Sequence, residues 1–290
     1  AFQNWKKVDA HERSAKLAQW AQLIDDHQDE LARLITLEGG KPLAEAKGEV
    51  AYANSYVKWY AEEAKRVYGR TIPANSPSKK IVIDKFPVGV VGAITPWNFP
   101  AAMITRKMAP ALAAGCTIIC KPAVKTPLTT IKLVELAHQA GFPKDAISYI
   151  IASGKDAGDI FTNHSLISKV TFTGSTAVGK SLIESSAQQV KNVTMELGGL
   201  APLIVHNDAD IEAAVDGTIA SKFRNAGQTC ICANRIYVHE DIAEAYNEKL
   251  IEKVHALSVG DGLKEEVKIG PLIDNQAVEK VLTHIKDAQE

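Results

Sequence analysis

The stretch VVGAI, at Val90–Ile94, is a short apolar run that opens a regular alternation of apolar and helix-length segments. The next apolar runs are Thr117–Cys120, Ile147–Ile151 and Lys169–Phe172. Alternation of this kind predicts an α/β fold, in which a parallel sheet is covered by helices on both faces. Such sheets bind ligands beyond the carboxyl ends of their strands, so we expect functional residues directly after these runs.

The residues upstream of the alternation, 1–68, predict helices. Asp9 followed by Glu12 fits a capping box at a helix start. The residues that follow repeat with the spacing of one apolar helix face, namely Leu17, Trp20, Ala21 and Ile24. A second helix is expected to end at Gly39–Gly40, and a third to run from Leu43 to Val67.

The composition changes between residues 69 and 87. Arg70–Ser78 is rich in turn-forming residues, and Lys80–Asp84 has the apolar and β-branched character of a strand. This pattern predicts an extended ribbon that leaves the body of the protein.

Charge and composition limit the class of protein. The 290 residues contain 33 Lys and Arg against 34 Asp and Glu, a formal net charge of −1, so we expect neither a nucleic-acid nor a membrane-surface partner. No apolar run approaches the length of a membrane span, and no signal peptide is recognised. The four cysteines suit reduced thiols in the cytoplasm, and no histidine pair has metal-ligand spacing, so no metal is expected.

Residues 174–181, GSTAVGKS, match the P-loop pattern G-x-x-x-x-G-K-[ST] between a strand and a helix. This motif makes a P-loop nucleotidase an alternative function. Against it, no apolar strand ends in an Asp that could hold magnesium, since Asp208 lies past the nearest apolar run. The narrower expectation is that Gly174 and Ser175 begin a helix that holds a phosphate.

Four other segments carry groups suited to carbonyl chemistry. They are TPWNFP at 95–100, KPA at 121–123, MELGG at 195–199 and NAGQTC at 225–230. A Cys230 thiolate can attack a carbonyl carbon, the Asn98 amide can stabilise the resulting oxyanion, and Glu196 can activate water if its carboxylate is partly buried. Taken singly, each residue also fits a structural role, as a buried thiol, a turn amide or a surface carboxylate.

In the order PWNFP, KPA, FTGSTAVG, ELGG and GQTC, the sequence resembles the aldehyde dehydrogenase family. The spacing of 34 positions from Glu196 to Cys230 also matches that family. The resemblance implies Cys230 as nucleophile, Glu196 as general base, and Asn98 as oxyanion donor together with the backbone N–H of Cys230.

The resemblance also implies a domain organisation and an assembly. A Rossmann-type cofactor domain would comprise residues 1–68 and 88–198, and an α/β catalytic domain would begin at 199–290. Residues 69–87 would form a small bridging ribbon used in oligomerisation, so a homo-oligomer, dimer or tetramer, is expected. Because family members extend beyond both ends, we expect an internal fragment that is poorly stable and little active alone.

The implied cofactor is NADP or NAD, although no G-x-G-x-x-G fingerprint is present. The residues expected to bind it are Trp97, Lys121, Val124, Gly154, Gly158, Gly174, Ser175 and Leu197. Family members that favour NAD often carry Glu three residues after this lysine, where Val124 stands here. Without that carboxylate a 2′-phosphate is not repelled, so we expect NADP to be accepted.

Two arginines point to the substrate. Arg106 follows Asn98 by eight residues and Arg224 precedes Cys230 by six, and guanidinium groups bind carboxylates bidentately. This pairing is similar to the succinate-semialdehyde dehydrogenase branch of the family, which implies oxidation of succinate semialdehyde to succinate. The alternatives are a structural ion pair for either arginine and an aldehyde of another class.

The remaining cysteines suggest two further expectations. Cys230 and Cys232 could form a strained, reversible disulfide that stops turnover, or Cys232 could be a second inert thiol. Cys116 and Cys120 are expected to be core thiols. Leu200, where relatives usually have a polar residue, has no explanation in the sequence.

Overall fold

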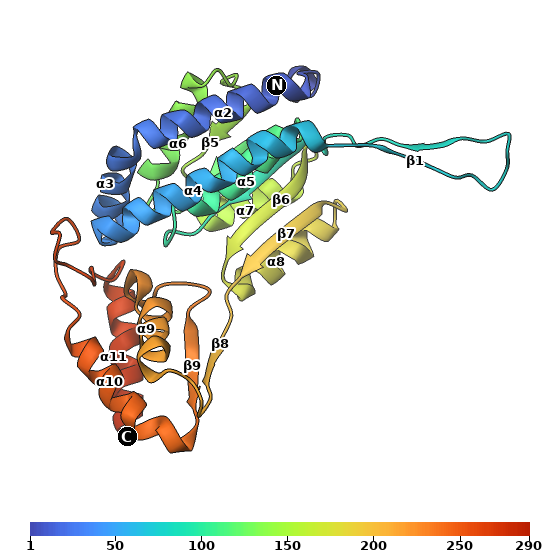
Figure 1. Ribbon diagram of the computed structural model, residues 1–290. Coiled ribbons are helices and arrows are strands. Elements are labelled where there is room, and N and C mark those ends of the chain that lie inside the picture. Colours follow the sequence, from blue (N-terminus) through green and yellow to red (C-terminus); the bar gives the residue numbers. More distant parts are fainter. The chain divides into compact units, whose positions relative to one another are not determined.

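The structure is a computed structural model that describes all of residues 1–290. Its contacts divide the chain into two compact units, each of which is described by itself. The first unit comprises Ala1–Gln28 and Val50–Glu196, and the second comprises Asp29–Glu49 and Leu197–Glu290. Helices and strands alternate in both units, and the predicted α/β class is confirmed (Figure 1).

The first unit is built on a five-stranded sheet in the order β5-β4-β3-β6-β7. Its strands are β3 (Val90–Ile94), β4 (Thr117–Lys121), β5 (Ile147–Tyr149), β6 (Ile167–Gly174) and β7 (Asn192–Leu197). Strand β3 pairs in parallel with β4 and β6, and β4 pairs in parallel with β5. All four strands predicted in this region exist, although β5 is shorter and β6 is longer than expected.

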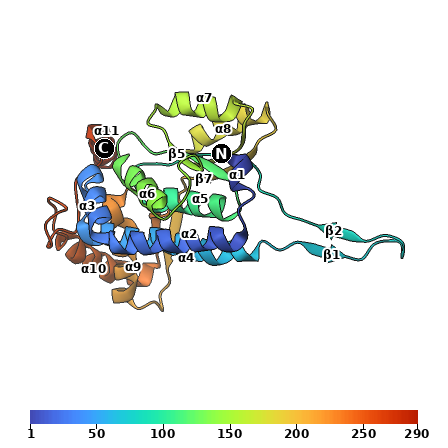
Figure 2. The ribbon, with the colours of Figure 1, turned by 90° about the horizontal axis from the view of Figure 1, so that it is seen from above.

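Helices flank the sheet of the first unit. They are α1 (Phe2–Trp5), α2 (Ala10–Asp26), α5 (Ala102–Ala113), α6 (Leu128–Gln139), α7 (Gly154–Asn163) and α8 (Thr176–Ala187), with the later part of α4 (Leu43–Glu63). Helix α5 packs on β3 and β4, whereas α7 and α8 pack on β6. Figure 2 shows α7 and α8 on the opposite side of the strands from α2. This arrangement buries the apolar central strands on both faces, as a parallel sheet requires.

The N-terminal helices form as their sequence predicts. The Asp9 carboxylate accepts hydrogen bonds from the backbone N–H groups of His11 and Glu12, at 2.9 and 3.0 Å. The four residues of the predicted apolar face of α2 are all buried. One of them, Trp20, also donates its indole N–H to the carbonyl oxygen of Leu133 on α6, at 3.1 Å. This bond fixes α2 against α6.

The chain leaves the body of the first unit after residue 66. Helix α4 ends at Glu63 and continues as the short 3-10 helix η1 (Ala64–Arg66), so the regular helix stops earlier than predicted. The chain then forms an antiparallel pair, β1 (Arg70–Ile72) and β2 (Ile81–Ile83). Figure 1 shows this pair extending away from the sheet. The ribbon is confirmed, and its role in contacts between subunits stays a prediction.

The second unit contains a smaller α/β arrangement. Its elements are α3 (Gln28–Gly39), the first part of α4, β8 (Ala201–Val205), α9 (Ile211–Lys222), η2 (Arg224–Gly227), β9 (Ala233–Val238), η3 (Glu240–Ile242), α10 (Ala243–His255) and α11 (Asn275–Gln289). Strands β8 and β9 are parallel. A core of Val205, Val215 and Tyr246 lies between the strands and helices, and the Tyr246 hydroxyl is 2.6 Å from Thr218 Oγ1.

Residues Asp29–Glu49 belong to the second unit, although the sequence placed all of 1–68 in the cofactor domain. Helix α3 ends at Gly39 as predicted, and Gly40 has φ +77°. A Cβ on Gly40 would lie 2.6 Å from Pro271 Cγ, so only glycine allows this approach to the C-terminal residues. The assignment of functional domains stays a prediction.

No helix of the structure combines the length and the apolar character needed to cross a membrane.

Candidate active site

Three of the predicted motifs meet at one edge of the sheet in the first unit. In the strand register, Ile94 of β3 lies beside Lys121 of β4 and Phe172 of β6. Because these strands are parallel, their carboxyl ends share an edge, and the chain leaves it into residues 95–100, 122–123 and 174–175. The edge at which ligands are expected therefore carries the PWNFP, KPA and FTGS segments.

Lys121 is suited to an anionic ligand. Its side chain is buried, and burial lowers the pKa of its ammonium group, with no charged neighbour contributing. Val124, three residues later, is 57% exposed, so the position at which a carboxylate is expected to favour NAD presents an apolar side chain. Trp97 lies on the adjacent loop, where its carbonyl oxygen accepts a hydrogen bond from Thr126 Oγ1 at 3.2 Å.

The start of helix α8 is open to a phosphate. The Ser175 side chain caps the helix by accepting from the Val178 N–H at 3.5 Å, and residues 175–178 are exposed. The other N–H groups of a first helical turn have no partner within the helix, and they attract anions. A Cβ on Gly174 would lie 2.4 Å from the Phe172 ring, so glycine is required at the entry to this helix.

The same geometry shows that the P-loop alternative is wrong. Thr176–Gly179 would have to form the loop that wraps around the phosphates, but these residues are helical. Gly179 already donates its N–H to the carbonyl oxygen of Ser175 at 3.0 Å. Lys180 accordingly lies inside an exposed helix and not at its start. A hydrogen-bonded helix cannot fold around a triphosphate, so only the narrower phosphate expectation remains.

The two glycines predicted at α7 differ in their surroundings. Gly154 opens the helix after the N-cap Ser153, and a Cβ there would meet nothing within 4 Å. Gly158 is buried, and its Cβ would lie 3.2 Å from Leu182 Cδ2 on α8. Gly158 therefore allows α7 and α8 to pack closely. A role in cofactor binding for either glycine, or for the half-buried Leu197, stays a prediction.

Glu196 and Asn98 both lie in the first unit. Asn98 is half-buried on the loop after β3. Glu196 is exposed, because β7 is the edge strand and its alternate residues point to solvent. The partial burial that suits a general base is therefore not seen in this chain. Its carboxylate lines a cavity of about 340 Å³ together with Arg106, Lys107 and Thr194.

Arg106 is oriented by an aromatic ring. Its guanidinium carbon lies 5.1 Å from the centre of the Tyr56 ring, and its Nη1 lies 3.8 Å from Met103 Sδ. Stacking of this kind holds the guanidinium plane without consuming all of its donors. Arg106 therefore keeps hydrogen-bond donors for an anionic ligand, in the cavity that Glu196 also lines.

Lys107 is a site residue that sequence reasoning missed. It is buried on α5, and its ammonium donates to Thr171 Oγ1 at 3.0 Å. Burial first, and then the charge of Arg106, lowers the pKa of Lys107 to about 8. The negative charge of Glu196 opposes this lowering of the pKa. The sequence does contain a sign of this residue, because Lys107 stands in the middle of a largely apolar helix. A lysine is rarely buried unless it is paired with another group.

Cys230 is exposed in the second unit, at the end of an unusual turn. Asn225, Ala226 and Gly227 have φ angles of +51°, +54° and +75°. Left-handed backbone costs a residue other than glycine about 1–2 kcal/mol, so Asn225 and Ala226 must be held there by their surroundings. The sequence predicted the nucleophile but not the turn.

Hydrogen bonds hold this turn. The Asn225 N–H donates to Glu45 Oε2 at 2.9 Å, and the Gln228 side-chain amide donates to the Asn225 carbonyl oxygen at 3.0 Å. The Ile273 N–H in turn donates to Gln228 Oε1 at 3.0 Å. Glu45 is a second residue that the sequence did not reveal, because its partner lies 180 residues away in the chain.

Arg224 lies among charged groups of the second unit. It lines a cavity of about 660 Å³ with Glu45, Lys253 and Lys268. Its charge contributes to lowering the pKa of Lys41, and it opposes the raised pKa of Glu45. The proximity to Glu45 supports the structural alternative for Arg224, whereas the cavity supports ligand binding.

The burial and contacts of the other three cysteines and of Leu200 are as follows. Cys116 and Cys120 are buried, so the predicted core thiols are confirmed. Cys232 is also buried, and its thiol lies 3.3 Å from Asn234 Oδ1. All four thiols are free, and a redox role for Cys232 stays a prediction. Leu200 is exposed, and its backbone carbonyl accepts from Arg235 at 3.0 Å.

Comparisons with known proteins agree with this geometry. The chain is 55% identical over 288 residues to a glutarate-semialdehyde dehydrogenase of Pseudomonas putida, covering 99% of this chain and 60% of the relative. It is 53% identical over 290 residues to the NADP(+) succinate-semialdehyde dehydrogenase of Escherichia coli, covering 100% and 60%. The crystal structure of a succinate-semialdehyde dehydrogenase from Burkholderia pseudomallei superposes with a TM-score of 0.98 at 52% identity, again covering 100% and 60%.

The chain thus spans about 60% of the length of the relatives it matches. The family model described as the aldehyde dehydrogenase family matches residues 1–290. The predicted resemblance is confirmed, and the chain belongs to the aldehyde dehydrogenase family.

Proposed function

We propose that the protein carrying these residues oxidises an aldehyde to the corresponding acid, with NADP or NAD as the electron acceptor. The aldehyde carries an anionic group at the end of the molecule opposite its carbonyl. The observation that carries this proposal is the exposed Cys230 thiol, presented by a left-handed turn in a chain of the aldehyde dehydrogenase family. An exposed cysteine at such a turn is accessible to a carbonyl carbon, and strained backbone is concentrated at functional sites.

The residues of the chain take the following roles. The Cys230 thiolate adds to the aldehyde carbon, and the Asn98 side-chain amide and the Cys230 backbone N–H stabilise the oxygen anion that forms. A bound nicotinamide would supply a hydride acceptor, and the hydride would leave the carbon atom that is bonded to the Cys230 sulfur. The product left on Cys230 is a thioester. Glu196 takes a proton from water, the hydroxyl adds to the thioester carbon, and the acid departs as the Cys230 thiolate is released.

The cofactor fits the edge of the sheet in the first unit. Lys121 is buried there without a charged neighbour, and the open start of α8 at Gly174 and Ser175 suits a phosphate. Lys121 ends β4 and Gly174 ends β6, the two strands that flank β3 on either side in the same parallel sheet. Trp97 would line the adenosine side, on the loop after β3.

Replacing Val124 with glutamate is expected to shift cofactor preference toward NAD by about 10- to 100-fold, because a carboxylate beside a 2′-phosphate costs a few kcal/mol. The measurement is the ratio of kcat/KM for NADP and NAD. Val124→Gln has the same size without the charge and should leave the ratio within a few-fold. An unchanged ratio in Val124→Glu, or a hundredfold preference for NAD in the unaltered protein, would refute this assignment.

The substrate class follows from two arginines and from the names of relatives. Glutarate semialdehyde and succinate semialdehyde, the substrates in those names, each carry a carboxylate at the far end from the aldehyde. Arg106 and Arg224 each offer a guanidinium group near a cavity. We propose succinate semialdehyde as the substrate, with glutarate semialdehyde, one methylene longer, as the alternative.

The variant Arg224→Ala is expected to lower kcat/KM for succinate semialdehyde about 10- to 100-fold, since a charge-assisted hydrogen bond contributes about 1.5–3 kcal/mol. Oxidation of propanal, which has no carboxylate, should change less than about threefold. Arg66→Ala removes an exposed arginine paired with Glu63 and serves as the matched control. If both aldehydes are affected equally, Arg224 has a structural role and the substrate assignment fails.

The proposed function as a whole is tested by following the absorbance of the reduced nicotinamide. Succinate semialdehyde, glutarate semialdehyde and propanal are supplied in turn with NADP and with NAD. Succinate semialdehyde should give the highest kcat/KM. Absence of reduced nicotinamide with every aldehyde would leave a family member without the activity, which acts as a binding or structural module.

A further inference from the structure

We propose that Glu45 is a positioning residue, whose carboxylate fixes the Asn225–Gly227 turn and thereby the placement of Cys230. The inference rests on the proposed role of Cys230 as nucleophile. It concerns a residue on α4 that is far from the catalytic motifs in the sequence and that lies in the second unit together with the turn.

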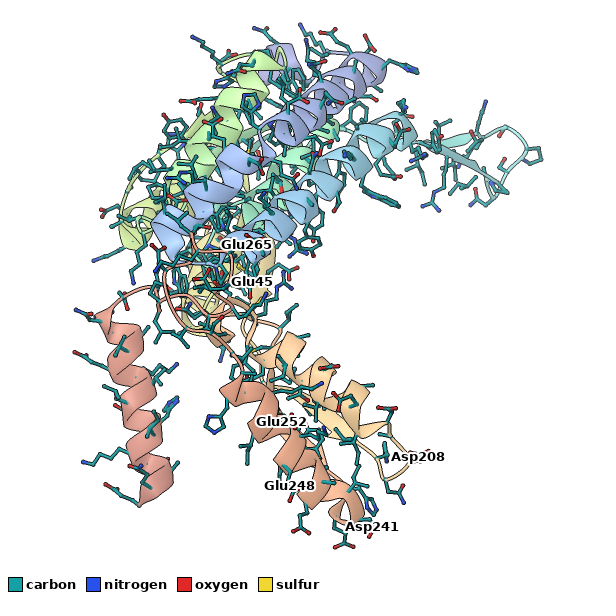
Figure 3. All side chains as sticks on the ribbon, turned by 60° about the vertical axis from the view of Figure 1, so that its left-hand side comes forward. Glu45, Asp208, Asp241, Glu248, Glu252 and Glu265 are labelled. Carbon is teal, nitrogen blue, oxygen red and sulfur yellow. The ribbon has the colours of Figure 1, made fainter.

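The contact itself is direct. Glu45 Oε2 accepts the Asn225 backbone N–H at 2.9 Å, which is a normal length for this bond. Glu45 stands in the first turn of α4 and is half-buried, and its position is labelled in Figure 3. A bond from a carboxylate to a backbone N–H is charge-assisted and stronger than one between neutral groups.

The turn needs support from outside itself. Its own bonds are local, since the Gln228 backbone and side-chain N–H groups both return to the Asn225 carbonyl oxygen. Asn225 tolerates left-handed backbone, but Ala226 is strained there, and such strain persists where the surrounding structure also constrains the residue. Two bonds tie the turn to distant residues: Glu45 accepts at its first residue, and the Ile273 N–H donates to Gln228 at its far end.

Glu45 is in turn held by its surroundings. Lys41 and Glu49, four residues before and after it, form a buried ion pair with each other. Burial raises the pKa of Glu45, whereas the Asn225 N–H, Lys41 and Arg224 favour its ionised form and Glu49 opposes it. The ionised carboxylate of Glu45 is therefore favoured by the charges of Lys41 and Arg224 and by its hydrogen bond from the Asn225 N–H.

Cys230 follows the turn by three residues. Without the acceptor, the Asn225 N–H loses its partner and the left-handed residues can relax. The thiol would then be presented in many orientations, of which few suit attack on a carbonyl, so kcat should fall while cofactor binding is retained.

The experiment compares Glu45→Ala, Glu45→Gln and Glu45→Asp in the protein that carries this chain. Gln keeps the acceptor without the charge, and Asp keeps the charge but is one methylene too short. Glu62→Ala is the matched control, because Glu62 is an exposed residue of the same helix whose carboxylate pairs with Lys65. The readouts are kcat and the KM for NADP, and amide hydrogen–deuterium exchange of the peptide that contains residues 225–228. The exchange measurement needs no substrate.

We expect Glu45→Ala to lower kcat at least tenfold with the KM for NADP changed less than twofold, and to speed exchange of the turn amides at least tenfold. Glu45→Gln should recover most of both losses, and Glu45→Asp should resemble Glu45→Ala.

If Glu45→Ala does not fold, the difference in kcat and exchange between Glu45→Gln and Glu45→Asp decides the test. Unchanged exchange, faster exchange with unchanged kcat, or a Gln variant as impaired as Asp would each overturn the proposal. If no aldehyde is oxidised by the unaltered protein, the proposed function fails, and the exchange data alone still decide whether Glu45 holds the turn.

Discussion

Replacing Cys230 with alanine is expected to lower kcat for every aldehyde by about 10⁴-fold or more, because the covalent route disappears and no other nucleophile takes its place. The thiol is exposed, and the turn that precedes it is held by Glu45 and Gln228, so the substitution removes the sulfur without removing the scaffold. Cofactor affinity should change little, since the proposed cofactor residues belong to the first unit.

The measurement is reduced-nicotinamide formation with saturating succinate semialdehyde, together with cofactor binding by fluorescence titration. Cys232→Ala, a substitution of the buried cysteine two residues away, is the matched control and should keep at least about a tenth of the activity. A Cys230→Ala protein that still turns over at a few per cent would show that the thiol is not the nucleophile.

Replacing Asn98 with alanine is the second large effect, with an expected loss of about 10²- to 10³-fold in kcat. The loss arises because negative charge develops on the aldehyde oxygen only after the Cys230 thiolate has added. An amide N–H aimed at that oxygen then stabilises the transition state more than the substrate. Asn98 lies on the loop that leaves β3 at the edge shared with Lys121, a location suited to a ligand-binding role.

The KM for the aldehyde should change much less than kcat, and this split distinguishes the role from simple binding. Asn98→Asp has nearly the same shape but places a carboxylate near the oxyanion, so its loss should equal or exceed that of alanine. Thermal unfolding of each variant controls for a structural effect. A loss below about fivefold in both variants, or one confined to KM, would contradict the oxyanion role.

Much of the first unit could be predicted because its signals are local. Asp9 caps α2 through N–H groups two and three residues away, and the apolar run Val90–Ile94 forms β3 with the predicted bounds. Capping depends on neighbouring residues and burial on periodicity, so both are visible in a short window of sequence. The alternation of strands and helices then predicted that the motifs directly after the strands lie together at the carboxyl ends of a parallel sheet.

The P-loop pattern shows that a short sequence motif can match without forming the structure that it usually forms. Residues 174–181 satisfy the pattern, but phosphate wrapping depends on backbone angles that the motif letters do not specify. Thr176 is already helical because the Ser175 side chain caps the helix there. The sequence also left the burial of Glu196 open, since the motif ELGG does not reveal that β7 lies at the edge of its sheet.

The α/β class, the family and the candidate nucleophile, base and oxyanion donor could be inferred from the sequence, because those depend on residue types in a fixed order. The burial of Lys107 beside the Glu196 cavity and the bond from Asn225 to Glu45 became visible in the folded chain. Burial and hydrogen bonding join residues far apart in the chain, as the separation of 180 positions from Glu45 to Asn225 shows. Such pairs leave no periodic mark in the sequence, because each partner is set by the packing of whole elements.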